Sequence, residues 1–139
     1  CTSASALLTG IPPQAIDRVW GDAKIYETYV GAKKFESDDE TFKVIRNIGK
    51  EYGATTGRPR QCNWLNWDFL EKSVKVNGVT DLVFNKMDVL RQINKWTLIH
   101  KGKKVTFDTE DKMKEWIVQK ANLLPYIPNV YFSGDPNGL

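Results

Sequence analysis

The chain has 139 residues, of which 41% are hydrophobic and 27% are charged, and its formal net charge at pH 7 is only +3. These values are typical of a globular domain, and they argue against intrinsic disorder and against a strongly basic nucleic-acid-binding surface. No apolar run approaches the roughly 18 residues of a membrane-spanning helix, and no signal peptide is recognisable. We therefore expect a cytoplasmic protein with no nucleic-acid or membrane partner.

The amino terminus reads "CTSASALLTG", without an initial Met and without a helix-capping signal. This start suggests that residues 1–139 are a fragment of a longer protein. The two cysteines, Cys1 and Cys62, lie far apart and have no His or second thiol at metal-ligand spacing. Neither a disulfide framework nor a zinc site is predicted.

The first predicted element is a helix within residues 11–31, "IPPQAIDRVWGDAKIYETYVG". Pro12 and Pro13 precede it, and proline is favoured in the first turn of a helix. Apolar side chains then recur at helical spacing, and the predicted buried face consists of Ala15, Ile16, Val19, Trp20, Ala23 and Ile25.

A second helix is predicted over about residues 39–50, with Ser37 or Asp38 as its N-cap and Gly53 as its stop. The stretch after it, "ATTGRPRQCN", spans residues 54–63 and is polar and basic. It contains a glycine and a proline and shows no strand alternation, so a loop is predicted.

The next predicted elements are a helix, a buried strand and a hairpin. "WDFLEKSVKVNG" predicts a helix that ends near Asn77 and Gly78, and residues 79–84, "VTDLVF", predict the strand. Residues 95–107, "KWTLIHKGKKVTF", alternate well enough for two strands joined at Lys101–Gly102.

The last part of the chain predicts a helix and a short strand. The helix begins after Asp108 or Thr109 and buries one face, consisting of Met113, Trp116, Ile117 and Ala121. The strand, Val130 to Phe132, enters a polar turn. Because helices and strands alternate, we predict an α/β fold: part of a mixed, mostly parallel sheet flanked by helices, with a small β-hairpin. In such folds ligands bind at the carboxyl ends of the strands.

One of those strand ends carries the sequence "FNKMDV", in which Asn85, Lys86 and Asp88 follow an apolar run. These residue types suit guanine, because a carboxylate accepts hydrogen bonds from the ring N–H and the exocyclic amine. An amide can reach the other edge of the base, and a lysine stem can cover its face. The alternative is a polar turn after a buried strand, which is common.

The loop "EYGATTGRPRQCNW" contains Thr55, Thr56, Arg58 and Arg60 around a glycine and a proline. Arginine binds carboxylate or phosphate through two parallel hydrogen bonds, and hydroxyl and backbone N–H groups can take the remaining oxygens. The loop is therefore a candidate anion site. The alternative is a solvated basic loop.

Catalytic machinery is scarce in the sequence. His100, the only histidine, lies in the predicted hairpin beside Lys101, where a surface or satisfied imidazole is expected rather than a base. No G-x-x-x-x-G-K-[ST] loop, G-x-G-x-x-G turn or G-x-S-x-G elbow is present. A guanine site without a phosphate-binding loop would be half a site.

The combination of "GATTGRPRQCNWL" with "NGVTDLVFNKMDVL" resembles the adenylosuccinate synthetase family, in order and in spacing. The opening "CTSASALLTG", the segment "DRVWGDAKIYETYVG" and the late turn "VYFSGDP" also resemble that family. The resemblance covers most of the chain but corresponds only to the carboxyl-terminal part of the enzyme. It implies that residues 1–139 need the amino-terminal part of the same enzyme, and that the complete enzyme is a homodimer.

The resemblance implies a set of binding residues. Those that would hold the substrates are Thr55, Thr56 and Arg58 for the carboxylates of L-aspartate, Arg60 between aspartate and the nucleoside triphosphate, Thr2 at the phosphate of the purine nucleoside monophosphate, and Val30 near its ribose. Those that would form the guanine pocket for GTP are Asn85, Lys86, Asp88, Ser133 and Gly134. Mg²⁺, the phosphate-binding loop and the catalytic Asp and His would belong to the amino-terminal part.

The implied activity is that of a C–N ligase in purine biosynthesis. The triphosphate phosphorylates O6 of the purine monophosphate, most simply IMP, and the amine of aspartate then displaces that phosphate. Such chemistry depends on positioning and charge stabilisation. Without the amino-terminal part, residues 1–139 are expected to be inactive.

The sequence departs from the family pattern at "AKKFESDD", in the shorter stretch before the last strand, and in the final Ser-Gly-Asp-Pro turn. Compact forms of this kind resemble archaeal enzymes and a viral variant that uses dGMP, in some cases with ATP rather than GTP. Two further alternatives are a non-catalytic guanine-nucleotide-binding module and a purely structural α/β domain. The anion loop favours the ligase, because a guanine-binding module has no use for it.

Overall fold

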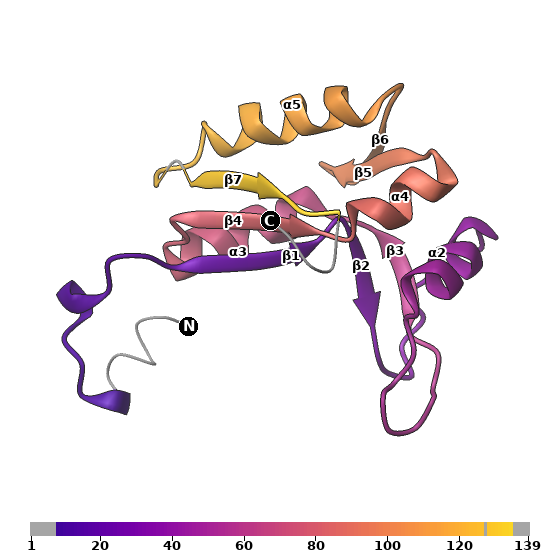
Figure 1. Cartoon of the computed structure of the whole chain (residues 1–139), viewed down its shortest axis with the longest axis horizontal. Helices are drawn as coiled ribbons and strands as arrows, with labels where there is room; N and C mark the ends of the chain where they lie inside the picture. Colours follow the sequence, from indigo (N-terminus) through magenta and orange to yellow (C-terminus); the bar gives the residue numbers. More distant parts are fainter. Residues whose placement is uncertain (1–7, 127, 135–139) are drawn as a thin grey trace.

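The computed structural model describes residues 8–126 and 128–134. Its centre is a parallel sheet with the strand order β1–β4–β7, formed by Trp20–Lys24, Asp81–Asn85 and Asn129–Phe132. Trp20 pairs with Asp81, and Asp81 pairs with Asn129. In Figure 1, α3 lies behind this sheet and α5 runs along its β7 side. The predicted α/β class, with a mostly parallel sheet and flanking helices, is confirmed.

The segment predicted as a helix over residues 11–31 is instead extended. A single 3-10 turn, Pro13–Ala15, is followed by β1 and then by β2, Tyr26–Tyr29. The helix prediction was wrong because a short apolar run fits both periodicities, and a distant strand decides between them. Gly21 and Ala23 pair with Leu82 and Phe84, so β1 gains the hydrogen bonds and the apolar face of β4.

β2 leaves the parallel sheet and pairs antiparallel with β3, Gln61–Trp64, with Tyr26 opposite Trp64. Only Ile25 separates β1 from β2, and its N–H donates to the Asn85 carbonyl at 3.0 Å. One continuous extended stretch therefore contributes to both sheets. Figure 1 shows β2 and β3 extending away from the parallel sheet, with the connection over residues 50–60 at their far end.

β3 corrects a second prediction, because residues 61–63 were assigned to the loop. Their side chains do alternate between intermediate and buried positions along the strand. Cys62 is buried with the core, and Trp64 packs its ring edge against Phe42, with 5.2 Å between the ring centres. The strand β3 was missed because its sequence is polar and because its partner, β2, was predicted to be part of a helix.

The predicted second helix is confirmed as α2, Thr41–Gly49, but its caps are not those expected. Neither Ser37 nor Asp38 caps it; Asp39 accepts a hydrogen bond from the Thr41 N–H at 2.9 Å. The helix ends before Gly53, because Lys50 adopts the left-handed conformation with φ 53° and its N–H bonds to the last turn. A lysine takes the position where glycine is usual.

The remaining predicted elements are confirmed. α3 is Trp67–Asn77 with Gly78 as its C-cap, the hairpin strands are β5, Trp96–His100, and β6, Lys103–Phe107, and α5 is Glu110–Ala121 with Thr109 as its N-cap. A short helix, α4, Met87–Ile93, was not predicted. It starts inside the polar motif that follows β4.

The core lies between the parallel sheet, α3, α5 and the hairpin. Phe84 of β4 stacks on Phe132 of β7, with 5.5 Å between the ring centres. Trp116 of α5 contacts the ring edge of Trp67 of α3, with ring centres 5.5 Å apart. These contacts fix the carboxyl ends of β4 and β7 side by side. Within residues 8–126 and 128–134, no helix has the length and apolarity needed to cross a bilayer.

Candidate functional site

The polar motif after β4 forms the junction between that strand and α4. Asn85 is the last residue of β4, Lys86 adopts a left-handed conformation with φ 66°, and Asp88 lies in the first turn of α4. Left-handed backbone costs a non-glycine residue roughly 1 kcal/mol or more. The strained backbone of Lys86 therefore destabilises the fold slightly, but the turn places a lysine and a carboxylate together at the end of β4.

The end of β7 meets this junction. The Ser133 N–H donates to the Phe84 carbonyl at 2.8 Å, and the Met87 N–H donates to the Ser133 carbonyl at 3.3 Å. Beside it, a methyl group added at Gly134 would collide with the Arg91 guanidinium of α4. The predicted guanine pocket included Lys86, Asp88, Ser133 and Gly134. The elements that carry these residues meet at the carboxyl ends of β4 and β7.

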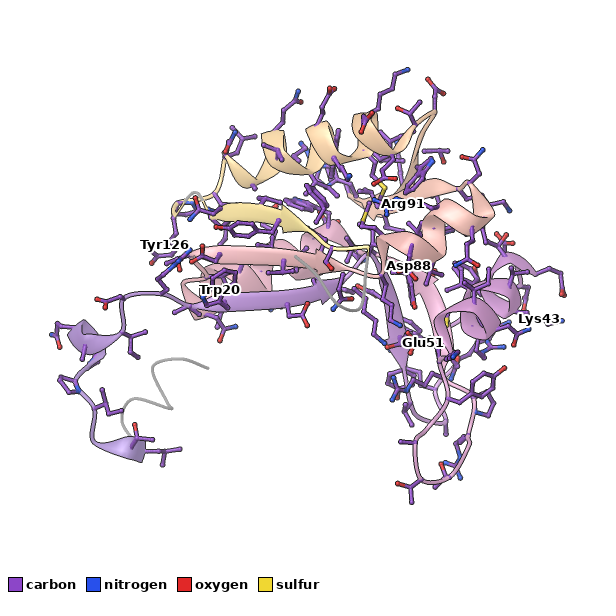
Figure 2. All side chains as sticks on the ribbon, viewed as in Figure 1. Trp20, Lys43, Glu51, Asp88, Arg91 and Tyr126 are labelled. Carbon is purple, nitrogen blue, oxygen red and sulfur yellow. The ribbon has the colours of Figure 1, made fainter. Side chains whose placement is uncertain are left out.

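Asp88 is the group best placed to receive a ligand at this edge. Its side chain is half-buried, and it has no hydrogen-bond or ion-pair partner in the part of the chain that the structure describes. Arg91, one turn further along α4, is held by two 2.7 Å hydrogen bonds to Glu110 of α5. Figure 2 shows Asp88 and Arg91 on α4, with Glu51 below them near β2 and β3. Asp88 is thus an unpaired acceptor beside a fixed cation.

Asn85 has a different environment from Asp88. Its Nδ2 donates to Asp22 of β1 at 2.7 Å, and its buried Oδ1 has no partner among the described residues. The amide is therefore engaged with the neighbouring strand. The sequence motif gave no sign of Asp22, because the segment that contains it was predicted to be helical.

The loop that contains the threonines and arginines is closed by its own backbone. The Gly53 N–H donates to the Arg58 carbonyl at 2.9 Å, and the Gly57 N–H donates to the Gly53 carbonyl at 2.8 Å. Gly57 has φ +64°, a conformation that its lack of a side chain permits. The turn leaves Thr55, Thr56 and Arg58 exposed to solvent. The Arg58 guanidinium has no acceptor among residues 8–126 and 128–134.

Arg60 is instead held by Glu51, a carboxylate only 2% exposed. Arg60 Nη1 donates to Glu51 Oε2 at 3.0 Å, the Lys24 ammonium lies 2.8 Å from both carboxylate oxygens, and the Tyr26 hydroxyl donates to Oε1 at 2.8 Å. Burial opposes ionisation of Glu51, but these donors outweigh it and hold the pKa of Glu51 below its ordinary value. Burial, together with the bond to Glu51, raises the pKa of Tyr26.

The two candidate half-sites meet at the end of α2. Lys86 Nζ approaches the Gly49 carbonyl at 3.4 Å, and Glu51, two residues later, binds Arg60. Lys24, the last residue of β1, pairs with Asn85 in the sheet and with Glu51 through its side chain. The segment Gly49–Glu51 therefore separates the strand-end residues from the anion loop and contacts both.

Two predicted site residues and the histidine remain to be placed. Val30 follows β2 and is 61% exposed, and Thr2 lies outside the described residues. His100 has its Nδ1 2.9 Å from Asp68 of α3, and its ring packs against Trp116, so it is a satisfied imidazole, as expected. It has a structural role in the hairpin.

Sequence reasoning missed Glu51 and Lys24. Glu51 is the first residue of the loop sequence "EYGATTGRPRQCNW", and an acid in an otherwise basic loop is a signal that could have been used. Lys24 ends β1 and would have been found by the rule that sites form at the carboxyl ends of strands. The mistaken helix over residues 11–31 concealed it.

Comparison with known proteins is consistent with these features. The family model described as adenylosuccinate synthetase matches residues 1–127. The adenylosuccinate synthetase of Syntrophobacter fumaroxidans is 44% identical over 93 residues, covering 66% of this chain and 22% of the relative. That of Oleidesulfovibrio alaskensis is 36% identical over 125 residues, covering 88% of this chain and 28% of the relative.

A solved structure, the fully ligated adenylosuccinate synthetase of Plasmodium falciparum, superposes with a TM-score of 0.77 at 22% identity. The superposition covers 97% of this chain and 42% of the Plasmodium falciparum chain, and it shows that the two share a fold. The chain spans only about a quarter of the length of the curated relatives it matches. Because the family model covers nearly all of the residues, the chain belongs to the adenylosuccinate synthetase family.

Proposed function

We propose that the chain supplies the L-aspartate-binding loop and the guanine-binding strand ends of an adenylosuccinate synthetase, a ligase of purine biosynthesis. The observation that carries this proposal is the convergence of the two half-sites on Gly49–Glu51. An anion loop and a strand end that can bind a base, both in contact with the segment Gly49–Glu51, suit a reaction that joins an amino acid to a nucleotide.

The loop supports a role in binding L-aspartate. Thr55, Thr56 and Arg58 are exposed, and the loop's backbone bonds hold them on one tight turn. Two hydroxyls and an unpaired guanidinium can satisfy both carboxylates of aspartate, the guanidinium by two parallel hydrogen bonds. Holding the carboxylates would orient the aspartate amine toward C6 of a purine monophosphate, where it displaces the phosphate previously transferred to O6 from the triphosphate. IMP is the proposed acceptor.

The strand end supports a role in binding the guanine of GTP. The Asp88 carboxylate, which has no hydrogen-bond partner within residues 8–126 and 128–134, can accept from the guanine ring N–H and from its exocyclic amine, and the Lys86 side chain can cover the base. Ser133 and Gly134 would border the pocket. Mg²⁺ would be bound by the amino-terminal part of the enzyme, as the family resemblance implies; within residues 8–126 and 128–134, no three His, Cys, Asp or Glu side chains cluster.

The experiment that tests the base assignment compares binding of GTP, xanthosine triphosphate and ATP to the chain by calorimetry. In Asp88→Asn, an amide donor replaces the acceptor that guanine requires, whereas xanthine presents a carbonyl in place of the amine. The preference for GTP over xanthosine triphosphate should therefore fall or invert, because a buried mismatch is rejected strongly. Asp111→Asn is the matched control, since Asp111 lies in the first turn of α5 and is exposed.

Two results would count against the assignment. If Asp88→Asn leaves the order of the three nucleotides unchanged, the motif is only a polar turn. If the unaltered chain binds ATP more tightly than GTP, Asp88 does not read guanine, and the nucleotide donor is ATP.

A further inference from the structure

Glu51 is a buried carboxylate with an unusual number of partners. It is 2% exposed and accepts hydrogen bonds from Lys24, Tyr26 and Arg60, which come from β1, β2 and the anion loop. Its own backbone carbonyl accepts from the Arg60 N–H at 3.0 Å. A buried charge is costly unless it is paired and fully hydrogen-bonded. This charge is paired twice, and both partners lie at the edge of the proposed site.

The way Arg60 is held leaves part of its guanidinium free. Only Nη1 contacts Glu51, and no other side chain in the described part of the chain accepts from the remaining nitrogens. The Nε–Nη2 edge, which donates the two parallel hydrogen bonds of a side-on fork, is therefore available for a ligand. Arg58 has no side-chain partner among the described residues and must lose side-chain freedom when it binds a carboxylate, whereas Arg60 has already lost much of it.

We infer that Glu51 is a positioning residue that fixes Arg60 so that the Nε–Nη2 edge of its guanidinium is presented to a carboxylate or phosphate of the substrate. This inference rests on the proposed function and extends it to a residue that does not itself touch the ligand. Lys24 shares the same carboxylate and anchors it to the end of β1. Glu51 thus sets the geometry of the anion loop as well as its charge.

The inference separates geometry from charge in a way that can be measured. Glu51→Gln removes a negative charge beside two cations, so attraction for any anion should rise. It also places an amide donor against the donors of Lys24 and Arg60, so Arg60 should lose its fixed orientation. The affinity for L-aspartate alone would combine the effect of the lost charge with the effect of the lost orientation. The ratio of affinities for L-aspartate and D-aspartate reports geometry, because the two ligands carry the same charge.

The test uses the full chain and titrates L-aspartate and D-aspartate by calorimetry into the unaltered chain, Glu51→Gln, Glu51→Asp and Arg60→Gln. The ratio in favour of L-aspartate should fall by about tenfold in Glu51→Gln and in Arg60→Gln, the size of one charge-assisted hydrogen bond. The double variant should fall no further than either single variant. Glu51→Asp, which keeps the charge, should recover part of the ratio.

The matched control is Glu110→Gln, because the Glu110 side chain is largely buried and binds an arginine, Arg91, that lies outside the loop and does not contact Arg60. It should leave the ratio unchanged. The inference is overturned if Arg60→Gln lowers the ratio and Glu51→Gln does not, or if Glu110→Gln lowers it equally.

A second measurement keeps the inference distinct from the proposed function. The hydrogen–nitrogen NMR signals of the Arg60 guanidinium, assigned by their loss in Arg60→Gln, should show a restrained side chain in the unaltered chain and in Glu110→Gln. They should show a mobile one in Glu51→Gln. If the unaltered chain does not distinguish the two aspartates, the proposed function fails, and these signals alone decide whether Glu51 positions Arg60. Equal mobility in all variants would overturn the inference.

Discussion

The Arg58 guanidinium has no acceptor in the described part of the chain, whereas Arg60 has Glu51. An unpaired guanidinium on an exposed loop keeps its full capacity to bind a ligand, and a carboxylate matches its planar fork. Lysine carries the same charge on a single nitrogen and cannot make two parallel bonds. The difference between the two side chains is therefore a direct probe of the loop.

We expect Arg58→Lys to weaken L-aspartate binding by about 2 kcal/mol, in the range of a charged hydrogen bond, and to change GTP binding little. Calorimetric titration of both ligands measures the two effects. L-Asparagine, which lacks the side-chain carboxylate, serves as the control ligand and should lose less affinity if Arg58 binds that carboxylate. Equal losses for aspartate and GTP would show that the assignment of Arg58 to aspartate is wrong.

At the scale of single elements, α3 depends on one side chain for its start. The Asn66 Oδ1 accepts from the Asp68 N–H at 3.1 Å and from the Phe69 N–H at 3.4 Å. These two donors have no partner within the helix. The cap matters for the hairpin too, because the first turn of α3 carries Asp68, which binds His100.

Asn66→Ala should lower the free energy of unfolding by about 1 kcal/mol, the usual cost of losing an N-cap. Urea unfolding followed by circular dichroism gives the difference. Asn66→Ser retains an oxygen that can accept the same bonds and should cost only a few tenths of a kcal/mol. Equal destabilisation by Ala and Ser would mean that the cap contributes nothing.

α4 and α5 are joined by a carboxylate that responds to pH. Hydrogen bonds from Arg91 and Lys114 lower the pKa of Glu110 from an ordinary 4.5 to about 2, although burial opposes this. A lowered pKa means that the folded chain favours the ionised form, so the stabilisation is complete above pH 4.5 and is lost as the pH falls toward 2.

We therefore expect the free energy of unfolding to fall across that pH interval, and to fall less steeply in Glu110→Gln, which has no proton to gain. Chemical unfolding at a series of pH values measures both slopes. Identical slopes in the two proteins would show that the pairing with Arg91 does not stabilise the fold.

How far the sequence predicts these elements depends on where their signals lie. Local signals predict the helices α2, α3 and α5 and the hairpin. The helices follow from their apolar periodicity, helped by Gly78 at the end of α3 and Thr109 at the start of α5, and the hairpin follows from the Lys101–Gly102 turn. Local signals do not predict β1 and β2, because these segments become strands by pairing with β4 and β3, which lie far away in the sequence. Prediction of the site is limited in the same way. The motif at Asp88 and the loop at Arg58 can be recognised in the sequence. The contacts of Glu51 cannot, because they join segments that meet only in the folded chain.

At the scale of the whole molecule, the proposed binding groups come without a recognisable phosphate-binding loop in the sequence. The sequence has no G-x-x-x-x-G-K-[ST] phosphate-binding loop, and its one histidine is engaged with Asp68. Charge stabilisation by the anion loop cannot replace a phosphate-binding loop and a base.

Residues 1–139 alone, mixed with IMP, GTP, Mg²⁺ and L-aspartate, should therefore form no succinylated nucleotide. Chromatography of the nucleotides after long incubation is a sufficient assay, and the complete enzyme of Syntrophobacter fumaroxidans is a suitable positive control. Turnover by the pure chain would refute the view that catalysis needs the amino-terminal part.

The continuous stretch formed by β1 and β2 also constrains how the molecule can be assembled during synthesis. β2 can pair with β3 once Trp64 has left the ribosome, whereas among the described strands β1 gains its partner only when β4 follows, and β7 comes later still. Pairings between distant segments carry the largest loop-closure cost and tend to form slowly. A nascent chain can thus hold β2 in place early, so that β1, attached through Ile25, is already extended when its partner emerges.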